Sequence, residues 1–209
     1  MVNCEDFKNF LIELSRQVLQ AKNELNSMDA ACGDGDFGST MASVFRDAKK
    51  ALEEFSGNDV GAVLTLTGTS ILSSAGGASG PTIATIFLEA GKAVKGKSEV
   101  NLQDIASMFE KAAQKVHLIG GASTGDKTLV DALEPAANAL KEAADAEVPV
   151  QTGLDRAAEA ATAGRESTKQ MVAKQGRARY LGEQTLGHVD PGAYLVSLMF
   201  TVLATTTGK

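Results

Sequence analysis

The chain has 209 residues, enough for one domain, or at most two small ones, with its own hydrophobic core. Its 20 Lys and Arg against 26 Asp and Glu give a net charge of −6, which argues against a nucleic-acid partner. No apolar run approaches the roughly 20 residues of a membrane span, and the mixed N-terminus is unlike a signal peptide. Two cysteines make no disulfide framework. We expect a soluble cytoplasmic protein with one domain over residues 1–209 and no membrane partner.

Apolar side chains recur at helical spacing along most of the chain. The first stripe occupies positions i, i+3, i+4, i+7 and i+11, which lie on one helical face. Its members are Phe7, Phe10, Leu11, Leu14 and Val18. Similar stripes predict helices over residues 41–55, 83–94, 105–116, 129–140, 154–172 and 194–203.

Two further segments decide the fold class. Residues 60–73 fit either a strand or a helix, and we predict a helix because a lone strand would have no partner. Residues 144–149 indicate a connector and not a domain boundary. The expected architecture is therefore all-α, with about eight helices and no sheet.

Glycines gather in four places between these helices. The clusters cover residues 33–38, 76–80, 120–125 and 176–192, and three of them lead directly into a helix. The first N–H groups of a helix have no partner within the helix, and its N-terminus carries a partial positive charge. Glycine-rich helix starts are therefore candidate anion-binding sites.

The first cluster is also acidic. Asp29, Asp34 and Asp36 fall within eight residues around Gly33 and Gly35. Crowded carboxylates repel one another, and a hard divalent cation such as Mg²⁺ supplies the counter-charge through oxygen ligands. The spacing alone leaves open a solvated acidic turn with Asx caps.

Several familiar motifs can be set aside here. Residues 33–38 match G-x-G-x-x-G, but no strand precedes them and two aspartates would repel a pyrophosphate. Residues 36–38 spell the kinase D-F-G, yet the chain has no H-R-D. An EF-hand would need Glu where Phe45 stands. Residues 120–128 resemble a Walker A loop with one residue too many and no strand before it.

The later glycine clusters each have a structural and a functional interpretation. Ser79 and Pro81 fit a capped helix start, which could also cradle a phosphate. Lys127 is a weak candidate that fits a surface cation equally well. Arg177 could bind a phosphate bidentately or be a surface arginine in a long loop. Asp190 is expected to cap the last helix.

The remaining reactive side chains give weaker signals. We expect His117, near a helix end, to be structural, whereas His188 lies in a glycine-rich loop and could contact a ligand. Cys32 is expected to be a small packed residue, since a thiolate among aspartates is disfavoured. Acidic and glycine-rich loops together indicate a Mg²⁺–nucleotide site of the kind that phosphoryl transfer uses. The residues do not identify the acceptor.

The motifs, taken in order, resemble the DhaL family, the nucleotide-binding subunit of dihydroxyacetone kinase. They are Asp29, the runs 33–38, 76–81, 125–128, 176–178 and 180–182, and Asp190–Gly192. The resemblance spans nearly the whole chain. It implies an eight-helix antiparallel barrel that binds ADP or ATP at one end.

The resemblance also implies the site residues. Asp29, Asp34 and Asp36 correspond to the ligands of two Mg²⁺ ions that bridge the nucleotide phosphates. The nucleotide contacts correspond to Phe37, Gly38, Ser39, Thr40, Ala78, Ser79, Gly120, Leu129, Arg177, Asp190, Pro191 and Gly192. The family usually has His at the position of Phe37, which could still offer its backbone N–H to a phosphate. Thr40 stands where some members have Asn.

Partners follow from the same resemblance. The substrate is expected on a histidine of a separate subunit, DhaK, and a phosphohistidine protein of the phosphotransferase system, DhaM, would recharge bound ADP. A chain of this length fits that subunit type better than a fused ATP-dependent enzyme, and a homodimer is possible. The alternatives are an ATP-exchanging subunit for another small ketose, a non-catalytic nucleotide-binding regulator and a helical interaction protein. A fatty-acid kinase would need a further lipid-binding module.

Overall fold

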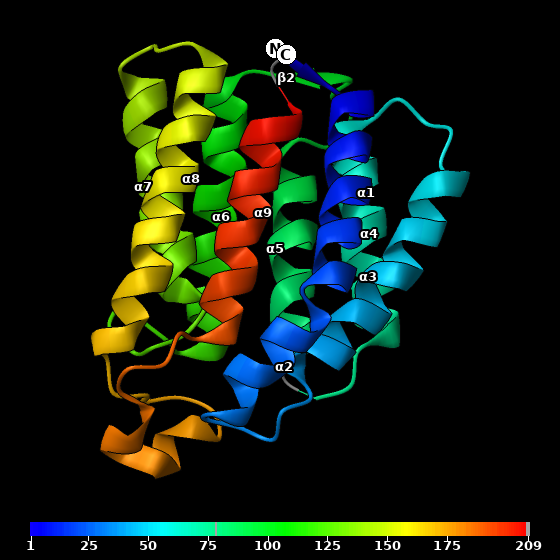
Figure 1. The fold of residues 1–209 in the computed structure, drawn as a ribbon. Helices are drawn as coiled ribbons and strands as arrows, with labels where there is room; N and C mark the ends of the chain where they lie inside the picture. Colours follow the sequence, from blue (N-terminus) through cyan, green and yellow to red (C-terminus); the bar gives the residue numbers. More distant parts are fainter. Residues whose placement is uncertain (78, 208–209) are drawn as a thin grey trace.

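Eight long helices stand side by side in a closed ring in the computed structural model, which describes residues 1–77 and 79–207 (Figure 1). They are α1 (Cys4–Gln20), α3 (Phe37–Glu54), α4 (Val60–Ser74), α5 (Ser79–Ala93), α6 (Leu102–Gly120), α7 (Val130–Asp145), α8 (Val150–Ser167) and α9 (Pro191–Thr206). Each helix packs against its neighbour in this order, and α9 packs against α1 to close the ring. The predicted all-α class is confirmed, and residues 60–73 are helical as expected.

Shorter elements add to this ring. A nine-residue helix, α2 (Lys22–Ala30), follows α1 after a break at Ala21. Two 3₁₀ helices, η1 (Thr168–Gln170) and η2 (Ala178–Thr185), lie between α8 and α9. The helix predicted over 154–172 therefore extends too far, because α8 gives way to the tighter 3₁₀ turn after Ser167.

A minimal sheet ties the N-terminus to the body. Strand β1 (Val2–Asn3) pairs antiparallel with β2 (Glu99–Val100), with Val2 opposite Val100. The sequence did not predict this pair, because two residues are too few for any alternation to be visible. Asn3 and Asn101 then begin α1 and α6 with capping boxes, so each strand leads directly into a helix.

The interior of the ring is filled by the predicted stripes. All five residues of the first stripe are at most 1% exposed. Aromatic rings from distant segments meet here, with Phe109 and Phe200 having ring centroids 4.6 Å apart. None of the helices within the described residues is both long and apolar enough to cross a membrane.

The up-and-down order of the helices places the glycine clusters together. Alternate connections of such a ring lie at the same end, and Figure 1 shows both termini at the opposite end. We call the end that lies away from the termini the glycine end. Its connections are residues 31–36, 75–77, 121–129 and 168–190. Helices α3, α5, α7 and α9 all begin there, so four helix N-termini converge on one face of the molecule.

Helices α4 and α5 cross closely because both carry glycine at the contact. A Cβ added to Gly61 would lie 2.6 Å from the Gly91 carbonyl oxygen, and one added to Gly91 would lie 2.7 Å from the Gly61 oxygen. Both distances are too short for a methyl group. The two helices can keep this spacing only with glycine at both positions.

We therefore expect Gly61→Ala to destabilise the protein by about 1–3 kcal/mol, the usual cost of overpacking, although alanine favours an isolated helix. Urea unfolding followed by circular dichroism measures the change. Gly120→Ala is the matched control, because nothing lies within 4 Å of a Cβ at this helical position. A Gly61→Ala protein as stable as the wild type would show that the crossing is looser than described.

Candidate functional site

Three carboxylates meet at the glycine end. Asp29 lies in the last turn of α2, Asp34 lies in the following loop and Asp36 directly precedes α3. One oxygen from each lies within 4.8 Å of the others. Asp29 is half-buried, whereas Asp34 and Asp36 are exposed. The three residues that the sequence singled out are thus brought together.

Asp29 also shapes the loop that carries the other two aspartates. Its Oδ2 accepts hydrogen bonds from the backbone N–H groups of Gly35, Asp36 and Phe37, at 2.9, 3.1 and 3.2 Å. Gly35 adopts φ 77°, a left-handed conformation that glycine allows at low cost. A Cβ on Gly33 would lie 2.5 Å from Asp29 Oδ1. Glycine at position 33 therefore leaves the second oxygen of Asp29 accessible.

This donor set fits a hard divalent cation. The cluster offers carboxylate oxygens only, which Mg²⁺ and Ca²⁺ prefer over nitrogen or sulfur. The thiol of Cys32 is buried nearby, and burial raises its pKa, which favours the neutral form. Cys32 is therefore a packed residue, as predicted, and not a metal-binding thiolate.

The start of α3 is fastened to α2. Asn26 Oδ1 accepts the backbone N–H of Ser39 at 2.9 Å, and Asn26 Nδ2 donates to the Ser39 hydroxyl at 3.0 Å. A Cβ on Gly38 would collide with the Lys22 carbonyl oxygen and with Asn26. The sequence analysis missed Asn26, since nothing in the local pattern marks a residue that reaches 13 positions along the chain.

Phe37 serves the fold at this helix start. Its side chain packs against the hydrophobic core, and its N–H donates to Asp29. The contribution of this N–H to a phosphate contact stays a prediction, and in this structure the N–H is used by the Asp29 carboxylate. The N–H of Thr40 likewise donates to the Asp36 carbonyl oxygen at 2.9 Å. The hydroxyls of Ser39 and Thr40 are the polar side-chain groups at this end of α3.

The start of α5 differs slightly from its prediction. The helix begins at Ser79, so Ser79 is its first residue and not the cap that we expected. Pro81 lies in the first turn as predicted, where a missing N–H is tolerated. Ala78, which we expected to contact the nucleotide, lies outside the described residues.

The connection between α6 and α7 holds an unexpected buried cation. Lys127, considered a possible surface residue, is only 5% exposed, so the surface interpretation is wrong. Burial lowers the pKa of its ammonium, against the opposing effects of Cys32, Asp190 and Asp131. His117 Nδ1 lies 2.9 Å from the carbonyl oxygen of Ala122, which agrees with its predicted structural role.

The connection between α8 and α9 brings Arg177 back to the acidic loop. The Arg177 guanidinium forms an ion pair with the Asp34 carboxylate, although the two residues are far apart in sequence. The imidazole of His188 is exposed, and it is the backbone carbonyl of this residue that makes a contact, accepting a hydrogen bond from Lys127. Arg177 thus lies beside the carboxylates, and its role in binding a nucleotide stays a prediction.

The last helix begins as predicted. Asp190 Oδ1 accepts the N–H of Ala193 at 2.7 Å and Pro191 occupies the first turn of α9. The pKa of Asp190 is raised to about 7, chiefly by burial. Hydrogen bonds from Ala193 and Gly192 and the charge of Lys127 act in the opposite direction and limit this rise. A Cβ on Gly192 would lie 3.2 Å from the Leu129 Cβ. The α7 and α9 starts are therefore in contact.

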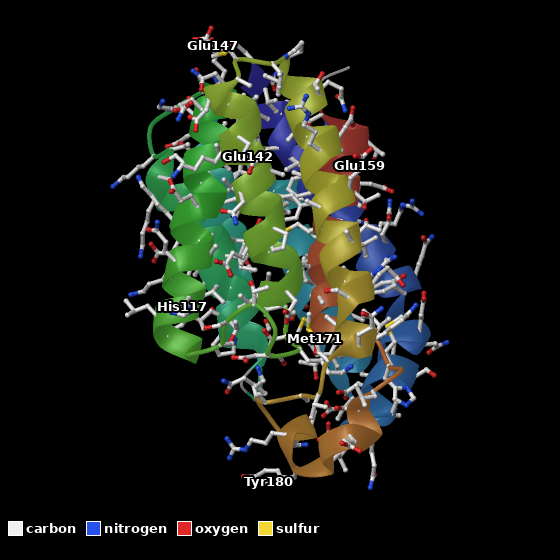
Figure 2. The ribbon with its side chains drawn as sticks, turned by 90° about the vertical axis from the view of Figure 1, so that its left-hand side faces the viewer. His117, Glu142, Glu147, Glu159, Met171 and Tyr180 are labelled. Carbon is white, nitrogen blue, oxygen red and sulfur yellow. The ribbon has the colours of Figure 1, made fainter. Side chains whose placement is uncertain are left out.

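The structure thus gathers the predicted residues from four connections on one face. Figure 2 shows Met171, Tyr180 and His117 at this end of the barrel and Glu147 at the opposite end. The positive ends of four helix dipoles lie beside three carboxylates, an arrangement that suits a divalent cation together with a phosphate. Gly120 ends α6 at this face.

The fold and site define an all-helical barrel with a carboxylate cluster and several helix N-termini at one end. The model of the DAK2 domain family matches residues 31–205, and the chain belongs to this family. The ADP-binding subunit DhaL of the PEP-dependent dihydroxyacetone kinase of Escherichia coli (strain K12) is 37% identical over 180 residues, which cover 86% of each chain. The corresponding subunit of dihydroxyacetone kinase 2 from Listeria innocua is 33% identical over 199 residues, covering 94% of this chain and 92% of that one.

A solved structure shares the fold. The dihydroxyacetone kinase of C. freundii, crystallised with AMP-PNP and Mg²⁺, superposes with a TM-score of 0.71 at 28% identity. The match covers 95% of this chain and 33% of that longer chain. The barrel described here therefore corresponds to about one third of that enzyme.

The role of Asp29 in shaping the acidic loop can be tested in the metal-free protein. We expect Asp29→Ala to destabilise it by about 1–2 kcal/mol, because three backbone N–H groups lose their acceptor. Asp36→Ala should change stability by less than about 0.5 kcal/mol, since Asp36 is exposed. Both variants remove one negative charge from the cluster, so the relief of charge repulsion is the same in each. Urea unfolding in EDTA provides the comparison, and equal effects would contradict the shaping role of Asp29.

Proposed function

We propose that this chain is the nucleotide-binding subunit of a dihydroxyacetone kinase. It would hold Mg–ADP or Mg–ATP at the glycine end and pass a phosphoryl group to dihydroxyacetone. The observation that carries this proposal is the cluster of Asp29, Asp34 and Asp36 beside converging helix N-termini. The names of the relatives, ADP-binding subunits of dihydroxyacetone kinases, supply the substrate class.

The metal would be held by the acidic cluster. Asp29 would offer Oδ1, since its Oδ2 is engaged by three N–H groups, and the exposed Asp34 and Asp36 would each offer carboxylate oxygens. Two Mg²⁺ ions, when bound, would neutralise the phosphate charges and the mutual repulsion of these carboxylates. The Arg177 guanidinium would then act at the phosphates and not at the metal.

The nucleotide would lie across the helix starts. The Ser39 and Thr40 hydroxyls, next to Gly38, would face the phosphates at α3, and Ala78 and Ser79 would contribute at α5. The remaining contacts proposed for the nucleotide are Gly120, Leu129, Arg177 and Asp190–Gly192. Leu129 is partly buried against the core and touches the start of α9, so it offers an apolar surface to the adenine.

Arg177 is proposed to assist phosphoryl transfer. Its guanidinium is exposed and reaches Asp34, so a small rotation would direct it from the carboxylate to a phosphate. Guanidinium groups bind phosphate oxygens bidentately and stabilise charge that develops during phosphoryl transfer. This chain would thus position the donor phosphate, while the acceptor comes from another subunit.

We propose that the acceptor is carried on a histidine of a DhaK-type subunit that docks at the glycine end. Among the described residues, every exposed large hydrophobic side chain except Met1 lies in this end or in the last turns of helices that run into it. They are Leu19, Leu72, Leu118, Ile119, Tyr180, Leu181 and Leu186. Exposed apolar side chains that gather at one end of a molecule are a common feature of protein–protein interaction sites.

The phosphoryl donor is proposed to be a phosphohistidine protein of the DhaM type that recharges ADP in place. The relatives named as PEP-dependent support this choice over free ATP. Nucleotide analysis of the purified, desalted and denatured protein tests it. Stoichiometric ADP is expected, whereas an empty site that binds Mg–ATP reversibly would favour an ATP-exchanging subunit.

Removal of a metal ligand should abolish nucleotide binding. We expect Asp36→Ala to weaken Mg–ADP binding at least 100-fold in isothermal titration of nucleotide-free protein, and EDTA to have the same effect on the wild type, because the phosphates then lack their counter-charge. Asp155→Ala removes an exposed aspartate of α8 at the opposite end and should bind normally. Unchanged affinity of Asp36→Ala would refute the assigned metal site.

The transfer step is tested with a purified DhaK-type subunit, dihydroxyacetone and the ATP-loaded protein. Formation of dihydroxyacetone phosphate is expected, and Arg177→Ala should slow it at least 100-fold while leaving Mg–ADP bound more weakly but measurably. A protein that binds Mg–ADP but transfers nothing to any supplied DhaK-type subunit would instead be a nucleotide-dependent regulator.

A further inference from the structure

Among the described residues, Lys127 and Asp131 are the two charged residues with almost no exposed surface, and both belong to one segment at the glycine end. Lys127 is 5% exposed and Asp131 is 1% exposed. Two of the other buried polar residues, Thr168 and Thr185, lie in the adjoining α8–α9 connection. A buried ammonium loses its hydration and needs protein partners. The partners of Lys127 therefore indicate what the residue does.

The Lys127 ammonium binds the two ends of the α8–α9 connection. Its Nζ donates to the carbonyl oxygen of Thr168 at 2.6 Å and to that of His188 at 2.5 Å. Thr168 begins this connection and His188 lies near its end. One side chain of the neighbouring loop thus joins both ends of the segment.

Hydrogen bonds within the connection also hold its two ends together. The Thr168 hydroxyl accepts the N–H of Asp190 at 3.0 Å, and the N–H of Gly187 donates to the Lys169 carbonyl oxygen at 2.7 Å. Residues 168–190 therefore form a loop whose ends are held together at Lys127. Arg177, near the middle of this loop, pairs with Asp34 of the acidic loop.

The backbone around Lys127 is arranged to direct the side chain inward. Lys127 adopts φ 60°, a left-handed conformation that is unfavourable for a residue with a side chain. Asp131 supports this turn by accepting the N–H groups of Gly125 at 2.5 Å and Thr128 at 2.6 Å. The buried carboxylate thus shapes the loop, and the loop presents the ammonium to the α8–α9 connection.

We propose that Lys127 is a positioning residue of the nucleotide site, which fixes the 168–190 loop so that Arg177 and the Asp190–Gly192 turn face the acidic loop. That the loop contacts a nucleotide rests on the proposed function. The fixing of the loop by Lys127 is independent of it. Lys127 touches neither metal nor nucleotide in this proposal.

Lys127→Met tests it, since methionine keeps the apolar stem and removes the donor. In the full-length protein, backbone hydrogen exchange of residues 171–189 should rise at least tenfold, with exchange in α4 and α5 little changed. Mg–ADP affinity, measured by isothermal titration, should fall at least tenfold. Lys127→Gln, which keeps a shorter neutral donor, serves as the second variant if the methionine protein does not fold.

Two controls separate the positioning of the loop by Lys127 from the loss of an exposed ion pair and from general destabilisation. Lys174 joins the same two loops through an ion pair with Asp126 at 3.0 Å, but its side chain is 61% exposed. Because exposed pairs contribute little, Lys174→Met should change loop exchange and Mg–ADP affinity less than twofold. Gly61→Ala destabilises the distant α4–α5 crossing and should leave the affinity unchanged.

The outcomes are distinct. Unchanged exchange of residues 171–189 in Lys127→Met would overturn the proposal. So would a Gly61→Ala protein that loses as much Mg–ADP affinity as Lys127→Met, because general destabilisation would then explain the loss. If the wild type binds no Mg–ADP, the proposed function fails, while a local rise in exchange confined to the loop would still support the positioning of the loop by Lys127.

Discussion

The alternating direction of eight helices in a closed ring is the constraint on which the site depends. Because every second connection returns to the same end, segments far apart in sequence meet without any long excursion of the chain (Figure 1). The same geometry points four helix N-termini toward that end. A net-negative chain thereby acquires a face on which fixed dipoles and a buried lysine favour anions, next to carboxylates that favour cations.

The sequence predicted what depends on local order. Helical stripes are visible because the core side of each helix repeats every 3.6 residues, and Asp190 and Pro191 identified the start of α9 because caps act within one turn. The three aspartates were found because they lie within eight residues of one another in the sequence. Residues 60–73 needed an argument from the rest of the chain, since their apolar side chains fit both a strand and a helix.

What the sequence could not predict depends on contacts between segments. The burial of Lys127 requires the α8–α9 connection to lie over the α6–α7 connection, which no local pattern encodes. The same holds for Asn26, which fastens α3, and for the pairing of Arg177 with Asp34. Phe37 packs against the core, and this contact with other helices gives the residue a structural role.

The helix starts at the glycine end are not equivalent, and this difference bears on where a phosphate can bind. Carboxylates already accept N–H groups at three of them: Asp29 before α3, Asp131 at α7 and Asp190 at α9. An anion would have to displace these acceptors. Helix α5 has no acidic residue in its first turn. A helix N-terminus favours an anion, so α5 would suit direct backbone recognition of a phosphate, whereas at α3 a metal held by the aspartates would balance the phosphate charge.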